Sequence, residues 1–129
     1  MLLTKRNEYA LQAMILLARR TSGTPLSAQS LARALRTSPG FMSKIAQRLA
    51  AAGLVTARKG KGGGLALARR PERIRARDIF RAVDGTLRLS QCMADGQCAH
   101  RVCPIYPTLR KVQIELDREI NAARLSKFV

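Results

Sequence analysis

The first apolar segment of the chain has the spacing of a helix. From Lys5 to Arg19 the residues are good helix formers, and the apolar ones occupy nearly every side of a helix drawn through the segment. Such a helix has no polar face to offer to water. We therefore expect it to be sandwiched between other elements of the fold.

Two further helices with a tight turn between them are predicted next. Ser27 can cap the first of them, which should end near Leu35. After a turn at residues 36–37, Ser38 and Pro39 begin the second helix. A serine hydroxyl accepts a hydrogen bond from a free amide, and proline suits the first helical position.

The second of these helices has two different faces. It should run to Ala52, where the following glycine stops it. Phe41, Ile45 and Leu49 recur every four residues and are expected to face the core. A short helix, a tight turn and a second helix with a basic outer face predict a helix-turn-helix. That outer face, turned toward solvent or a ligand, consists of Ser43, Lys44, Gln47 and Arg48.

A glycine-rich hairpin is predicted after the helix-turn-helix. Residues 54–57 and 65–68 have strand character, and the loop 58–64 between them has the sequence Arg-Lys-Gly-Lys-Gly-Gly-Gly. No Gly-Lys-Ser/Thr follows the glycines and no helix begins there, so a phosphate-binding nucleotide loop is not indicated. Three cations on a glycine frame suit a wing that enters a narrow groove and lies along phosphates.

The last third of the chain is predicted to hold a connector, a cysteine-rich loop and a long helix. A short helix should span residues 76–83, and Pro107-Thr108 should start the final helix, which runs to about Ala123. Its apolar residues repeat with steps of three and four, and we expect this seam to pair with a second copy of the chain. The seam consists of Leu109, Val112, Leu116, Ile120 and Ala123.

Charge indicates the partner of the N-terminal half. The chain has 129 residues, enough for one ordinary domain, and its formal net charge is +16. No acidic residue lies between Glu8 and Glu72, whereas eleven bases do. A basic, acid-free surface is typical of proteins that bind nucleic acid.

The predicted DNA-binding residues lie on the second helix and on the wing. Four of them occupy positions where base edges could be read: Ser38, Phe41, Ser43 and Gln47. The others should contact phosphates or the minor groove: Lys44, Arg58, Lys59 and Lys61. The fold class expected from all these elements is mainly α, a winged helix-turn-helix with a long C-terminal dimerisation helix.

The residue composition indicates where the protein is located and which class of function is not expected of it. No segment approaches the roughly twenty apolar residues that span a bilayer, and the N-terminal apolar run is too short for a signal peptide, so a cytoplasmic protein is expected. A single histidine and dispersed acids offer no convergent catalytic constellation, so no enzyme is predicted.

All three cysteines of the chain lie close together. Five residues separate Cys92 from Cys98, and four separate Cys98 from Cys103. Three kinds of site fit this loop: an iron-sulfur cluster, a zinc site completed by His100, or thiols that switch by disulfide formation. Structural zinc sites usually show two-residue gaps, and the wider gaps here favour something larger than one ion.

The order of these elements resembles the Rrf-two family of bacterial winged-helix iron-sulfur transcription regulators. The similarity covers nearly the whole chain. It rests on the cysteine loop and on the motifs Leu3-Thr4, Tyr9-Ala10, Ala52-Gly53-Leu54-Val55, Arg58 to Gly64, Asp78-Ile79 and Ala82-Val83.

The resemblance implies a homodimer that binds a palindromic double-stranded DNA operator and carries one iron-sulfur cluster per subunit, of the 4Fe-4S or 2Fe-2S type. Carried over by position, Cys92, Cys98 and Cys103 would be the cluster thiolates, and Lys59 would enter the minor groove. The resemblance assigns the fourth ligand to Glu8 of the partner subunit. Apart from the resemblance, His100 within the cysteine loop is a minor candidate.

The function predicted is that of a repressor whose cluster senses nitric oxide, redox state or iron supply and modulates operator binding. One alternative is a cluster-free switch in which Cys98 and Cys103 form a disulfide; another is a zinc-stabilised structural protein that binds nucleic acid. The expected organisation is a DNA-binding domain with its connector helix at 1–85, a cluster-binding loop at 86–107, and a dimerisation helix with its tail at 108–129.

Overall fold

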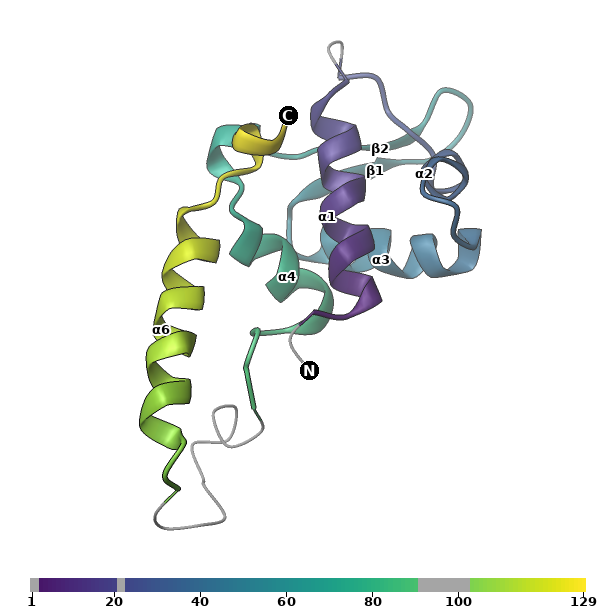
Figure 1. The fold of residues 1–129 in the computed structure, drawn as a ribbon. Coiled ribbons are helices and arrows are strands. Elements are labelled where there is room, and N and C mark those ends of the chain that lie inside the picture. The colour runs from purple at the N-terminus through teal and green to yellow at the C-terminus, as the bar shows by residue number, and fades with distance from the viewer. Residues whose placement is uncertain (1–2, 21–22, 91–102) are drawn as a thin grey trace.

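The computed structural model describes residues 3–20, 23–90 and 103–129. Helices form most of it, and a two-stranded antiparallel sheet projects from one end (Figure 1). The expected fold class, a winged helix-turn-helix with a long C-terminal helix, is confirmed. The elements in order are α1 (Lys5–Ala18), α2 (Ala28–Ala34), α3 (Pro39–Ala51), β1 (Val55–Arg58), β2 (Gly64–Leu67), the 3-10 turn η1 (Pro71–Arg73), α4 (Ala76–Asp84), α6 (Tyr106–Ala122) and η2 (Leu125–Phe128).

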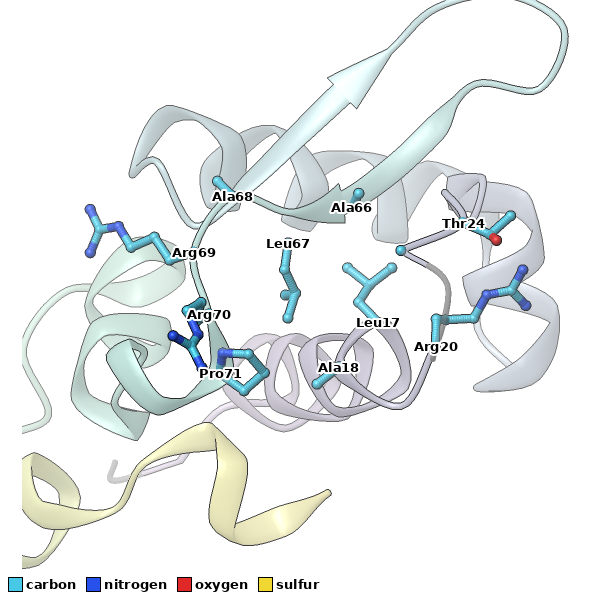
Figure 2. Close-up of a pocket in the computed structure, with 11 residues that line it drawn as sticks. Leu17, Ala18, Arg20, Thr24, Ala66, Leu67, Ala68, Arg69, Arg70 and Pro71 are labelled. Carbon is cyan, nitrogen blue, oxygen red and sulfur yellow. The ribbon is translucent and has the colours of Figure 1, made fainter.

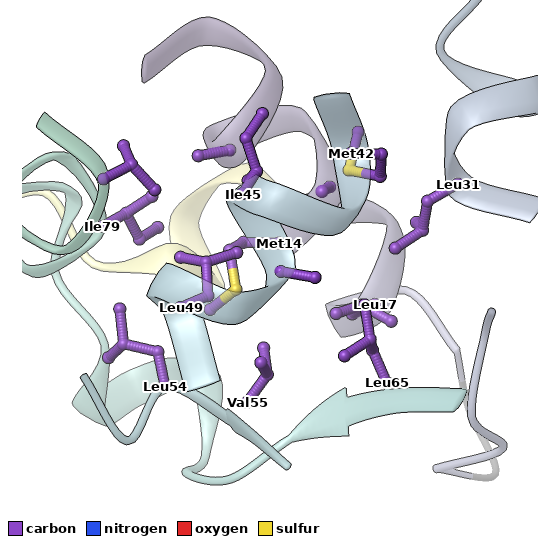
Figure 3. Packing of buried hydrophobic residues seen from close by; sticks show 14 of the residues in the cluster. Met14, Leu17, Leu31, Met42, Ile45, Leu49, Leu54, Val55, Leu65 and Ile79 are labelled. Atoms are coloured by element: carbon purple, nitrogen blue, oxygen red, sulfur yellow. The ribbon is translucent and has the colours of Figure 1, made fainter. Parts of the chain in front are cut away.

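Helix α1 lies at the centre of the fold, as its all-round apolar pattern predicted. Thr4 caps it by accepting a hydrogen bond from the Asn7 amide at 3.3 Å. Helices α3 and α4, strand β2 and η2 all pack against it. Its buried apolar residues, Met14 and Leu17 among them, meet the core residues of α3 and the wing (Figure 3). The sandwiched helix is thus confirmed.

The helix-turn-helix begins at the predicted caps. Ser27 accepts from the Ser30 amide at 3.0 Å, and Ser38 accepts from the Phe41 amide at 3.2 Å. The core face of α3 differs from the prediction, since the buried residues are Met42, Ile45, Ala46 and Leu49. Phe41 does pack against this core but is only half-buried, whereas Met42 lies in line with Ile45 and Leu49 at spacings of three, four and seven residues and is fully buried.

The wing is the predicted hairpin, shifted by one residue. Strands β1 and β2 pair antiparallel, from Val55 opposite Leu67 to Arg58 opposite Gly64. A single antiparallel β-bridge joins this hairpin to Leu26, the residue before the cap of α2. The Leu26 amide donates to the Leu65 carbonyl at 2.9 Å, and the Leu65 amide donates to the Leu26 carbonyl at 2.7 Å.

Helix α6 begins at Tyr106, two residues earlier than predicted, and packs along α4. A second apolar cluster holds the two helices together, and it includes Leu116, Ile120 and Ala123. Three residues of the predicted dimer seam therefore pack within their own chain. Val112, by contrast, is 49% exposed. The seam prediction was thus wrong in part, because α4 and the segment after it cover one side of the apolar stripe.

Candidate nucleic-acid interface and cysteine site

A notch of about 350 Å³ separates α3 from the wing. Ser43 and Gln47 of α3 line one wall, Arg58 of β1 lines the other, and the start of α2 forms part of the rim. Three of the predicted DNA-binding residues therefore come together from two elements. Lys44 is exposed on the same helix, and Lys59 and Lys61 are exposed in the wing loop.

Two predicted residues lie at the margins of this surface. Ser38 is exposed at the start of α3, where its hydroxyl is engaged as the helix cap. Phe41 is half-buried, and its ring meets the ring of Tyr9 edge-on with centroids 5.7 Å apart. Phe41 thus packs against α1 and does not line the notch.

The wing loop requires its glycines. A Cβ on Gly63 would lie 2.3 Å from the carbonyl oxygen of Arg58, and a Cβ on Gly64 would lie 2.7 Å from the backbone of Leu26. Gly64 also has a φ of 140°, a conformation that L side chains rarely adopt. The glycines close the loop tightly and let the wing dock against the chain before α2.

The cations of this surface have no acidic neighbours. In the described residues, the side chains of Lys44, Arg58, Lys59 and Lys61 form no ion pair and no hydrogen bond to the protein. Among the bases between Glu8 and Glu72, Arg70 alone pairs with a carboxylate in the described ranges, at 3.5 Å from Glu72. The face formed by α3 and the wing therefore carries unneutralised positive charge.

Arg48 is exposed on α3 as expected, but its guanidinium does not end free in solvent. Its guanidinium donates to the carbonyl oxygen of Val83, in the last turn of α4. In the same turn, Asp84 pairs with Arg6 of α1 at 3.0 Å. Two arginines from separate helices thus tie down the end of α4. The sequence held no signal for these contacts, because Arg48 and Val83 are 35 residues apart.

The hydrogen bonds of the Gln113 side chain were likewise not predicted from the sequence. It is buried in α6, where its amide nitrogen donates to the Leu87 carbonyl and its amide oxygen accepts from the Leu89 amide, both at 2.9 Å. The side chain pairs with the backbone as a neighbouring strand would. Gln113 thereby fixes the segment between α4 and the cysteine loop to α6.

The cysteine site is described only in part. Cys103 lies just before α6 with a free, half-buried thiol, and its carbonyl accepts from the Tyr106 amide at 3.1 Å. Glu8 is exposed in the first turn of α1. Cys92, Cys98 and His100 lie outside the described residues. Within the described ranges, no three acidic, histidine or cysteine side chains come together as metal ligands.

A second hollow of about 410 Å³ lies between the end of α1 and the base of the wing. Leu17 and Leu67 point into it, whereas Arg20 and Arg69 point away (Figure 2). The side chains that point into the hollow are apolar, so it lacks the convergent polar groups that orient a ligand. We therefore assign it no function.

Comparison with known proteins places this geometry in a family. A family model described as "Rrf2: Iron-dependent Transcriptional regulator" matches residues 3–129. A Mycobacterium tuberculosis protein named as a helix-turn-helix-type transcriptional regulator is 37% identical over 87 residues, which cover 67% of this chain and 54% of the relative. The alignment thus spans only about half the length of that relative.

Other relatives align over more of their length. CymR of Bacillus subtilis, a helix-turn-helix-type transcriptional regulator, is 31% identical over 101 residues, which cover 78% of this chain and 73% of CymR. Its solved structure, described as that of the global cysteine regulator, has a TM-score of 0.82 at 24% identity and covers 98% of this chain and 94% of that one. At this identity the likeness shows the fold.

IscR from T. potens is similar in structure as well. Its TM-score is 0.77 at 25% identity, with 98% of this chain and 84% of that chain covered. No helix in the described ranges is long and apolar enough to cross a membrane. Since the family model matches almost the full length, the chain belongs to the Rrf2 (Rrf-two) family of transcriptional regulators.

Proposed function

We propose that this protein is a DNA-binding repressor that acts as a homodimer and responds to an iron-sulfur cluster. The observation that carries the DNA-binding part is the face formed by α3 and the wing. Its cations have no protein partner in the described residues, and they frame a notch lined by Ser43 and Gln47. Phosphates supply the missing negative charge, and small polar side chains suit contact with base edges.

In the proposed complex, α3 lies in the major groove and the wing reaches the adjacent minor groove. The exposed Lys59 and Lys61 project from the loop between β1 and β2, where they can follow the narrow groove. Lys44 and Arg58 would contact phosphates on either side of the notch. Sequence would be read mainly by Ser43 and Gln47, because Phe41 packs against Tyr9.

The dimer is proposed from the uncovered side of α6. Val112 and Ile105 share one edge of this helix region and are 49% and 53% exposed. Apolar side chains of this size at helical spacing are typical of an interface between subunits. A two-fold dimer would present its two α3 helices to half-sites separated by about one DNA turn or a multiple of it, as a palindromic operator requires.

The cluster would be held by Cys92, Cys98 and Cys103, with Glu8 of the partner subunit as the fourth ligand. Three thiolates suit iron in a sulfur-rich site, and a hard carboxylate oxygen is a poorer match there than a fourth thiolate would be. Cys103 and Glu8 are both accessible, as ligands to a shared group must be. When bound, the cluster would supply an iron whose carboxylate ligand is exchangeable and therefore open to a small molecule such as nitric oxide.

A contiguous set of contacts supports communication between this site and α3. The loop that carries the cysteines follows the segment held by Gln113, and this segment follows the end of α4. The end of α4 is in turn bound to α3 through Arg48 and to α1 through Arg6. A change at the cysteines that moved α4 would therefore also move α3. In the dimer, this would change the position of one DNA-binding face relative to that of the partner subunit.

Visible absorption of protein purified without oxygen tests the cluster. The proposal predicts a brown protein whose colour is lost in Cys98→Ala. A colourless protein with one zinc ion per subunit would instead support the zinc-stabilised protein. A colourless, metal-free protein that forms a reversible disulfide between Cys98 and Cys103 would support the thiol switch. The free thiol of Cys103 and the description of CymR as a cysteine regulator make this switch the second candidate.

The fourth ligand is tested by a pair of variants. Glu8→Ala should keep a cluster on the three thiolates but change its spectrum and its reactivity with nitric oxide, whereas His100→Ala should leave both as they are. If His100→Ala disturbs the spectrum and Glu8→Ala does not, the ligand is His100 and the cross-subunit arrangement is wrong.

A further inference from the structure

Helix α3 ends in a turn that is built for glycine. The Gly53 amide donates to the Ala50 carbonyl and the Leu54 amide donates to the Leu49 carbonyl, both at 3.0 Å. These two bonds form the Schellman motif, in which the residue after the helix cap takes the left-handed conformation. Gly53 has a φ of 74°. Glycine adopts this backbone without the clash that a Cβ would bring.

Helix α2 ends in the same motif with an arginine in the glycine position. The Thr37 amide donates to the Ala32 carbonyl at 2.9 Å, and the Arg36 amide donates to the Arg33 carbonyl at 3.3 Å. Arg36 has a φ of 55° and is the only residue in the described ranges, other than glycines, with a positive φ. The chain thus uses glycine in one of two equivalent positions and accepts a strained residue in the other.

The fold itself makes no visible use of the arginine side chain. Arg36 is exposed, and in the described residues its guanidinium forms no hydrogen bond and no ion pair. Its turn leads directly into α3, and the start of α3 lies on the same side of the molecule as the wing loop, with α2 between them (Figure 1). Nothing in the described part of the fold thus explains why an arginine, with its strained backbone and unpaired guanidinium, stands at this position.

We propose that Arg36 binds a DNA phosphate and so extends the interface from α3 and the wing onto the α2–α3 turn. This inference rests on the proposed DNA-binding function. An arginine fork matches phosphate geometry, and the exposed Arg36 is free to meet one. The strain in the free protein is then the consequence of keeping a cation where glycine would fit better.

The two roles of position 36 can be separated by substitution. Arg36→Gly should raise the midpoint of thermal unfolding by roughly 2–5 °C, because it removes the left-handed strain. The same change should weaken binding to a short labelled duplex of mixed sequence by roughly three- to tenfold near 0.1 M salt and reduce the salt slope by about one. Stability and affinity are expected to move in opposite directions.

Three further variants complete the experiment. Arg36→Lys should keep the slope, and Arg36→Asn, which tolerates the left-handed backbone, should lose one unit of slope even if Arg36→Gly folds poorly. Arg110→Ala, which removes one charge from exposed α6, should leave the slope unchanged. Wild-type slope in both Arg36→Gly and Arg36→Asn would overturn the proposal while leaving DNA binding intact. A wild-type protein that does not bind the duplex would overturn the proposed function itself.

Discussion

The two ends of this chain need different partners. The end formed by α1, α2, α3 and the wing has a closed apolar core, and its surface cations are almost all unpaired in the described residues. The end formed by α6 carries acids as well as bases, with Arg118 bound to Glu115 at 2.8 Å and Arg88 at 3.9 Å from Asp117, and it exposes Ile105 and Val112 along one edge. Unmet charge indicates a polyanion, and unmet apolar surface indicates a protein.

The largest effect is expected on the exposed apolar edge of α6, which we propose to be the dimer interface. Val112→Asp should convert the dimer to monomers, because an unpaired charge buried between subunits costs roughly 3–5 kcal/mol. Ile114 is equally exposed, at 49%, but lies on the far side of the helix from Val112, so Ile114→Asp is the matched control and should remain dimeric. Sedimentation that finds Val112→Asp still dimeric would refute the assignment.

A second test concerns the attachment of the wing. Gly64→Ala should destabilise the protein by roughly 2–3 kcal/mol, because the added Cβ meets the backbone of Leu26 and the backbone itself suits only glycine. Gly40 has open space around it in α3, so Gly40→Ala should be neutral or slightly stabilising. Chemical denaturation of both variants measures the difference. Equal stabilities would show that the wing does not dock as described.

Replacing Asn7 should change the stability of the fold by a smaller amount than Gly64→Ala, and should increase it. Its side chain is fully buried, and neither polar atom has a hydrogen-bond partner in the described residues. Asn7→Leu should therefore raise the free energy of unfolding by about 1–2 kcal/mol, because two unsatisfied polar atoms are replaced by apolar ones of similar volume. Loss of stability in this variant would mean that the amide has a partner in the folded protein.

The sequence predicted those parts of the fold whose signals are local. Ser27 and Ser38 cap the helices they were expected to cap, and the glycine run forms the tip of the hairpin. The predictions failed where a second element decides. Phe41 packs only at the edge of the core, where Met42 is the buried residue, and Leu116 packs against its own chain because α4 covers it. Periodicity marks an apolar face but does not say which surface covers it.

The candidate site likewise has features that the sequence predicted and features that it did not. The unpaired cations of the wing could be predicted from the absence of acids in the surrounding sequence. The contacts of Arg48 with Val83 and of Gln113 with Leu87 could not, because each joins elements more than twenty residues apart through a backbone carbonyl, which leaves no trace in the residue types. The cluster ligands stay a prediction, because Cys92 and Cys98 lie outside the described residues.

If the acid-free end of the chain binds DNA through its unpaired cations, the affinity must fall with salt in proportion to the phosphates they contact. The measurement is the affinity for one labelled duplex at several salt concentrations, compared between the wild type, Lys61→Ala on the wing and Lys111→Ala on the exposed side of α6. Lys61→Ala should reduce the slope of log affinity against log salt by about one, whereas Lys111→Ala should not change it. An unchanged slope in Lys61→Ala together with a reduced slope in Lys111→Ala would place the DNA surface on α6 and not on α3 and the wing.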